Sequence, residues 1–209
     1  MGVRESFRKF TRELADYTDR LSRRYDIPGM GYDIVGLAPD EGNGITASVG
    51  TTSTGLTKLE ILWRYLSDKE VLRHESRHLL MPPNLIGGIY DRVKGGVANI
   101  SAAIAEASVV EGQVDDDGIP LSNLEGYAPI KEGLYRLGRK VADAAGGAKR
   151  LYHLVRDRAQ QGLVDLINSR PDVAREFRDF YNSYNPNLLQ RYGMFEPALA
   201  PARVDGYNY

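Results

Sequence analysis

Two histidines and a glutamate lie within five residues of each other and have the spacing of a zinc site. His74, Glu75 and His78 form the pattern His-Glu-x-x-His. Four residues advance an α-helix by about 400° and 6 Å, so the two imidazoles leave the same face one turn apart, as two ligands of one ion must. Glu75 lies about 100° round from His74 and can accept a proton from a metal-bound water without ligating the metal. The chemistry indicated is hydrolysis by activated water, since zinc lowers the pKa of its water toward about 7.

The composition makes this pattern informative. The chain has 209 residues, only 3 His and no Cys. For a chain of this composition, roughly 0.002 matches to the pattern are expected by chance. The absence of Cys excludes thiolate zinc sites, iron–sulfur clusters, disulfides and a cysteine nucleophile. His153 is therefore the one imidazole outside the pattern.

Charge and hydropathy limit the partners. The formal net charge is -1, so no overall field gathers nucleic acid or an anionic membrane, and we expect no nucleic-acid partner. Residues 1–10 contain no apolar h-region, and no stretch reaches the roughly 18 apolar residues of a membrane span. We therefore expect a cytoplasmic protein without a membrane span.

A catalytic zinc needs a third protein ligand and an open position for water. Residues 79–84 contain no further His, so a carboxylate from a later helix is the natural candidate. Glu106 and Glu111 lie on one expected helix but point about 140° apart, so both cannot face the metal. We favour Glu111, because Asp115 follows it by one turn and could accept from the second nitrogen of a zinc histidine. Glu106 is the alternative third ligand.

The elements that must position these residues follow from periodicity. Apolar residues at helical spacing predict an amphipathic helix over residues 3–24. Residues 32–37 and 45–49 are rich in β-formers and flank a turn at 39–44, which predicts a hairpin. Alternation over 59–65 predicts a third strand with one buried face.

The helix that carries the histidines should begin at a capping box. Ser67 and Glu70 have the spacing for it, and Pro82 and Pro83 prevent continuation, so a helix over about 68–81 is predicted. A largely buried helix follows over 97–114, with Asn99 as a possible N-cap, and Asp115–Asp117 close it as a solvated loop rather than a calcium site.

The last third of the chain is helical in pattern over about 129–183, broken at Gly146, Gly147 and Pro171. We therefore expect one two-lobed α+β domain. It has a helix-plus-sheet lobe over about 1–81, a helical lobe over about 82–184 and a tail over 185–209.

Together these residues resemble those of the gluzincins, the thermolysin-like and related zinc peptidases. The resemblance rests on His74, Glu75 and His78, followed by Glu111 and Asp115. It implies a zincin-like fold with a small sheet, an active-site helix and a glutamate helix, in that order. It also implies a Zn2+ cofactor and hydrolysis of peptide bonds in a peptide or protein substrate, with Glu75 as general base.

The resemblance covers about residues 32–116. Glu111 and Gly112 are similar to the Glu-Gly found on that helix in aminopeptidase-type members. Arg77 departs from the pattern, because that position is usually uncharged in these peptidases. Its side chain could point away from the zinc or pair with an acid.

The resemblance further implies a substrate-binding edge and an oxyanion donor. The strand over 59–65 is the expected edge that binds an extended peptide by strand addition, although it could equally be a plain core strand. His153 is the candidate oxyanion stabiliser, with Tyr127, Tyr135 and Tyr152 as phenolic alternatives.

Two alternatives remain open at this point. The tail that ends in Tyr207 and Tyr209 could lie across the cleft as an inhibitory segment. The alternative to an enzyme is a non-catalytic binding or regulatory protein with a structural metal site or a degenerate zincin fold.

Overall fold

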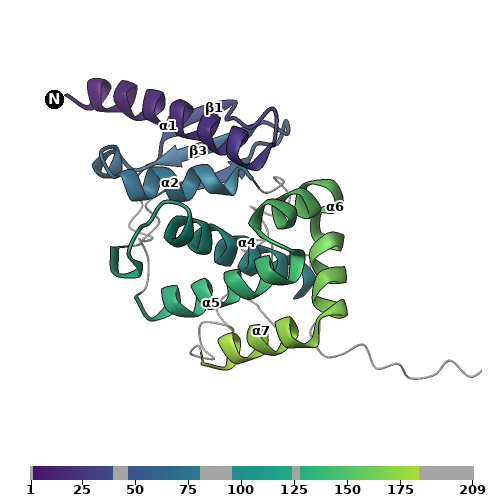
Figure 1. Cartoon of the computed structure of the whole chain (residues 1–209). Helices are drawn as coiled ribbons and strands as arrows, with labels where there is room; N and C mark the ends of the chain where they lie inside the picture. Colours follow the sequence, from purple (N-terminus) through teal and green to yellow (C-terminus); the bar gives the residue numbers. More distant parts are fainter. Residues whose placement is uncertain (1, 40–46, 81–95, 124–127, 184–209) are drawn as a thin grey trace, which may run out of the picture.

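The computed structural model describes residues 2–39, 47–80, 96–123 and 128–183, which form a small sheet and a larger helical part (Figure 1). The strands are β1 (Ile34–Leu37), β2 (Ala47–Thr51) and β3 (Thr57–Ile61). The α-helices are α1 (Val3–Tyr25), α2 (Lys69–His78), α4 (Gly96–Asp115), α5 (Ala128–Ala145), α6 (Ala148–Ser169) and α7 (Pro171–Ser183). The expected mixed α+β composition, with the sheet in the N-terminal part, is confirmed.

The strand order is β1-β3-β2, which differs from the predicted hairpin. β3 pairs in parallel with β1 and antiparallel with β2, so β1 and β2 do not pair with each other. The hairpin prediction was wrong because turn signals report only local chain reversal, whereas pairing depends on burial. Leu59 and Ile61 are both 0% exposed, and β3 accordingly takes the central position.

The predicted strand over 59–65 is right only in its first half. β3 ends at Ile61, and Trp63–Tyr65 form a short 3-10 helix in which the Trp63 side chain is 58% exposed. β3 is also not an edge strand, so the expected peptide-binding edge is corrected. Within the described sheet the edges are β1 and β2, and β2 lies next to α2.

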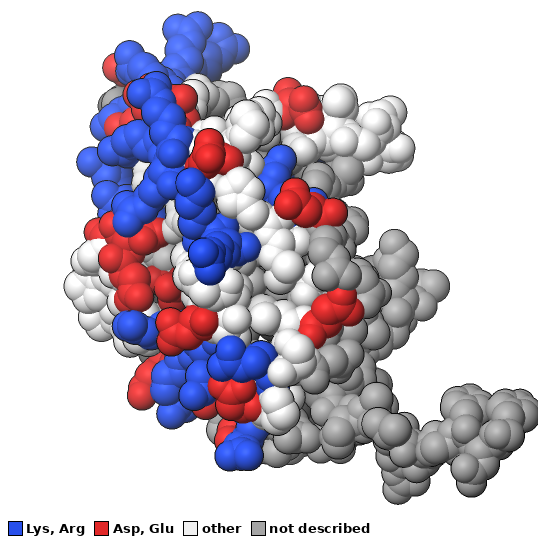
Figure 2. Space-filling view, turned by 45° about the vertical axis from the view of Figure 1, so that its right-hand side comes forward, with Lys and Arg blue, Asp and Glu red and all other residues white. Residues whose placement is uncertain are grey.

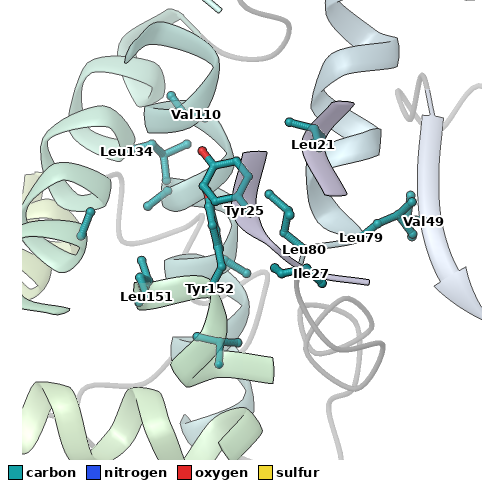
Figure 3. Packing of buried hydrophobic residues seen from close by; sticks show 14 of the residues in the cluster. Leu21, Tyr25, Ile27, Val49, Leu79, Leu80, Val110, Leu134, Leu151 and Tyr152 are labelled. Carbon is teal, nitrogen blue, oxygen red and sulfur yellow. The ribbon is translucent and has the colours of Figure 1, made fainter. Parts of the chain in front are cut away.

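Helix α1 confirms the amphipathic prediction. One face of it is buried against the rest of the molecule, and α1 packs on α2. The chain leaves the helix through Asp26, whose φ of 56° is the left-handed conformation that ends many helices. Figure 3 shows Leu21 and Tyr25 of this helix beside core residues from later elements. The buried residues of α1 are Phe10, Leu14, Tyr17, Thr18, Leu21 and Tyr25.

Helix α2 begins with a different cap from the one expected. The Asp68 carboxylate accepts from the backbone N–H groups of Glu70 (2.9 Å) and Val71 (3.2 Å), so Asp68, not Ser67, is the N-cap. The helix ends at His78 rather than 81. The capping-box prediction was wrong by one residue, because Asp and Ser are both good caps and only the backbone decides between them.

Helix α4 begins at Gly96, so Asn99 lies inside it and is not its cap. The predicted breaks between the last helices are confirmed, since α5 ends before Gly146 and Gly147 and α7 begins at Pro171. Each described helix falls short of the combined length and apolar character that a membrane crossing requires. Figure 2 shows basic side chains gathered toward the end of the molecule where α1 lies, with both signs of charge interspersed elsewhere.

Helices α4 and α5 approach closely at a glycine, and this contact can be tested. A Cβ on Gly138 would lie only 2.2 Å from the backbone oxygen of Ala107. We expect Gly138→Ala to lower the free energy of unfolding by about 1–3 kcal/mol, because backbone must move to admit the methyl group. Urea denaturation checks this, with Gly36→Ala as control, since a Cβ there meets no atom within 4 Å. Equal stability of the two variants would contradict the close approach.

Candidate metal centre

Two imidazoles from α2 and one carboxylate from α4 converge at the interface of these helices. His74 Nε2 lies 3.1 Å from Glu106 Oε1, and His78 Nε2 lies 3.3 Å from Glu106 Oε2. The two Nε2 atoms are 3.2 Å apart. The side chains of His74 and His78 are 15% and 14% exposed and that of Glu106 is 26% exposed, so the cluster is half-buried.

The separation of 3.2 Å between the two histidine Nε2 atoms fits two ligands of a small tetrahedral ion. Bonds of about 2.0–2.1 Å to zinc place neighbouring tetrahedral ligands about 3.3 Å apart. Within the described residues, His74, His78 and Glu106 are the group whose donor atoms all lie close enough to hold one ion. Two imidazoles and one carboxylate also match the ligand types of catalytic zinc sites that leave a fourth position open. The residues present therefore fit a zinc ion.

Gln113 of α4 orients the first imidazole. His74 Nδ1 lies 2.9 Å from Gln113 Oε1, and Gln113 Nε2 donates to the backbone oxygen of Glu70 at 3.2 Å. Because the amide nitrogen is held by that carbonyl, the amide oxygen must accept from His74. The proton of a neutral His74 is then on Nδ1, which leaves the Nε2 lone pair facing Glu106 and His78.

The electrostatics of the cluster favour positive charge. Burial disfavours a protonated His74, but the charges of Glu106 and Glu75 and the hydrogen bonds that His74 donates to Glu106 and Gln113 outweigh it and raise the pKa of His74 to about 10. Burial would raise the pKa of Glu106, yet His74 and His78 hold it well below the usual range. Glu106 is thus an ionised carboxylate, and the same negative charge that favours a proton on His74 would favour a metal cation in place of that proton.

Glu75 follows His74 on α2 and is 6% exposed. Its charge contributes to the raised pKa of His74, so its carboxylate is within electrostatic reach of that imidazole. It is absent from the group that could hold an ion. This placement is compatible with a base that stands beside the metal rather than on it.

The structure brings Glu106 to the imidazoles, and this differs from the expected Glu111. Glu111 is 7% exposed, and burial, followed by the charges of Asp115 and Asp116, raises its pKa to about 7. The base of its side chain lies against α5, since a Cβ on Gly138 would lie 2.8 Å from Glu111 Cβ. The face of α4 that carries Glu111 is therefore turned to α5, and the preference for Glu111 is corrected in favour of the alternative.

Asp115 was expected to accept from a zinc histidine, but Gln113 occupies that position. Asp115 instead accepts from the Tyr135 hydroxyl at 2.9 Å and lies 3.5 Å from Arg139 Nη1. Gln113 follows Glu106 by seven residues, about two turns, so the two share one face of α4. This i, i+7 spacing is the sequence signal that could have indicated Glu106 together with Gln113. The sequence prediction considered a partner only one turn, four residues, after each glutamate, and that spacing does not include Gln113.

The described contact of His153 is with the end of α1. Its Nε2 donates to the backbone oxygen of Tyr25 at 2.7 Å, at the end of α1. Tyr152 donates to the backbone oxygen of Ser108 at 2.8 Å, and Tyr135 binds Asp115. In these contacts none of the three side chains meets His74, His78 or Glu106, and an oxyanion role for any of them stays a prediction. Tyr127, Pro82 and Pro83, and the tail with Tyr207 and Tyr209, lie outside the described residues.

Comparison of the chain with protein-family models, with curated proteins and with solved structures found no match. The functional argument therefore rests on the geometry of the site.

Proposed function

We propose that this protein is a zinc-dependent hydrolase of peptide bonds. His74, His78 and Glu106 are the ligands and Glu75 is the general base. The observation that carries the proposal is that one donor atom from each of the three side chains lies within 4.8 Å of the other two, with the two histidine Nε2 atoms 3.2 Å apart, which suits one small ion. The adjacent Glu75 adds a base to the site, which a purely structural metal would not need.

Zinc supplies a Lewis acid and an acidified water when it is bound. Gln113 holds His74 in the tautomer that presents Nε2, and Glu106 contributes the charge that favours a cation. Glu75 accepts the proton of the attacking water on its carboxylate and delivers it to the nitrogen of the leaving amine. The same side chain thus acts as base and then as acid.

The sheet offers a place for an extended substrate. Among the described strands β2 is at an edge of the sheet, where it pairs on one side with β3 and lies next to α2. An extended peptide that paired with the other side of β2 would gain backbone hydrogen bonds and run beside the helix that carries His74 and His78. We therefore include peptide binding by strand addition at β2 in the proposal.

The direct test is metal loading followed by cleavage. After incubation with zinc and removal of excess ion, we expect one zinc per chain by elemental analysis. The loaded protein should cleave members of a mixed peptide library, detected by mass spectrometry, and a chelator should abolish the cleavage. Failure to retain zinc would contradict the metal centre. Retained zinc without cleavage would instead indicate a structural metal site.

A further inference from the structure

Arg77 lies in the helix of the metal ligands, next to His78, yet its side chain is 0% exposed. Its guanidinium donates to Asp116 Oδ2 at 3.3 Å and to Asp117 Oδ2 at 3.0 Å. Both acids follow directly after the end of α4. Arg77, which replaces the usual uncharged residue, thus forms ion pairs that connect α2 with the end of α4, the helix that carries Glu106.

Helix α1 completes the arrangement around the same two carboxylates. Tyr17 donates its hydroxyl to Asp117 and Tyr25 donates its hydroxyl to Asp116. The Asp116 and Asp117 side chains are 17% and 14% exposed, so the expected solvated loop is wrong for these two residues. We call Arg77, Asp116, Asp117, Tyr17 and Tyr25 the Arg77 cluster. It joins α1, α2 and the end of α4.

Gly112 leaves the space through which Arg77 reaches the acids. A Cβ at this position would lie 2.5 Å from Arg77 Nη1 and 3.0 Å from its Cζ. The guanidinium therefore lies directly on the backbone of α4, one residue from Gln113. Any larger residue at 112 would displace the guanidinium or the helix.

The Arg77 cluster restricts the position and the rotation of α4 relative to α2. A buried guanidinium without its carboxylates is strongly unfavourable, so α4 must place Asp116 and Asp117 at Arg77. A shift of α4 by one residue would move it about 1.5 Å and turn it about 100°. Such a shift would carry Glu106 and Gln113 away from His74. The position of the ion pair and the position of the third ligand are thus coupled through one rigid helix.

We propose that the Arg77 cluster is the positioning element of the metal centre, which holds Glu106 and Gln113 in place against the two histidines. The inference rests on the metal site of the proposed function but not on its catalytic activity. Arg77 is a positioning residue, since its described contacts are with the cluster and with Gly112.

The test is the metal affinity of variants of the full chain. We expect Arg77→Met to lower zinc affinity by about 10–100-fold, the range seen when residues that orient metal ligands are changed. Affinity is measured by competition with a chromophoric chelator. The visible absorption of the Co2+-loaded variant should also change, because the ligand geometry changes, and a loss of stability alone would not produce that change in a folded sample.

Arg139→Met is the matched control. Arg139 pairs with Asp115, the last residue of α4 and the neighbour of Asp116, but it comes from α5 and its side chain is 52% exposed. We expect it to change zinc affinity by less than about threefold. A second variant, Gly112→Ala, keeps every charge but displaces the guanidinium or the helix backbone beneath it, and it should also weaken binding.

Zinc affinity and a Co2+ spectrum equal to wild type in folded Arg77→Met would overturn the inference. If Arg77→Met does not fold, the Tyr17→Phe, Tyr25→Phe double variant decides the question in the same assay. Unchanged affinity in that double variant would also overturn it. If wild-type protein binds zinc but cleaves no peptide, the proposed hydrolase activity is contradicted. The inference about the Arg77 cluster is not affected by that result, because the zinc affinities of these variants still test it.

Discussion

Glu75→Gln is expected to retain zinc and to lower kcat/KM for peptide cleavage by at least about 100-fold, the lower end of what a positioned general base contributes. Gln has nearly the same size as Glu but cannot accept a proton from the attacking water. The substituted side chain is outside the group that could hold the ion, so the affinity for zinc should change little. Steady-state kinetics and elemental analysis on the same sample separate the two effects.

The control for this prediction is Glu70→Gln, the same chemical change on the same helix. The Glu70 backbone oxygen, which the substitution preserves, is what holds Gln113. Its cleavage rate should stay within about threefold of wild type, since the Glu70 carboxylate is outside the group of donors that could hold the ion. Undiminished turnover in Glu75→Gln would refute its role as base, even if zinc is bound.

Glu106→Gln should lower the affinity for zinc by at least about 100-fold, because loss of an ionised ligand costs at least as much as loss of a residue that orients one. Glu111→Gln should change it by less than about threefold, since Glu111 is absent from the group of donors. The sequence by itself favoured the reverse order. Chelator competition measures both affinities under one set of conditions.

Glu111→Gln also has an expected effect on stability that makes it an informative control. The pKa of Glu111 is raised to about 7 by burial, followed by the charges of Asp115 and Asp116. The folded protein therefore binds a proton more tightly than the unfolded chain, and Glu111 destabilises the fold increasingly as pH rises from about 4.5 through about 7. Gln is always neutral, so the variant should be more stable than wild type at pH 8 in thermal unfolding. If Glu111→Gln loses zinc while Glu106→Gln retains it, Glu111 is the third ligand.

Local features of this chain were predictable from residue spacing. The helices α1 and α4 agree with their predicted ranges to within a residue or two, because apolar periodicity reports the face that a helix must bury. The cap of α2 was missed by one residue, since Ser67 and Asp68 are both suitable and lie side by side. Such errors leave the phase of the helix, and hence the histidine pair, unchanged.

Non-local features were not predictable in the same way. The hairpin expected from two strands and a turn is replaced by a central β3 that pairs with both neighbours. The acids expected to be solvated are held by Arg77, which is about 40 residues earlier in the chain. In both cases the deciding contact joins residues whose distance in sequence carries no information about their distance in space.

The sequence by itself determined that His74 and His78 share one helix face with Glu75 beside them, because four residues are about one turn of any α-helix. Only the tertiary structure decided that Glu106, and not Glu111, meets them. Both glutamates lie on α4 about 140° apart, and helical spacing gives their relative phase but not which phase turns toward α2. That rotation is set by packing, with Gly138 of α5 against Ala107 and Glu111 on one side of α4 and Arg77 over Gly112 on the other.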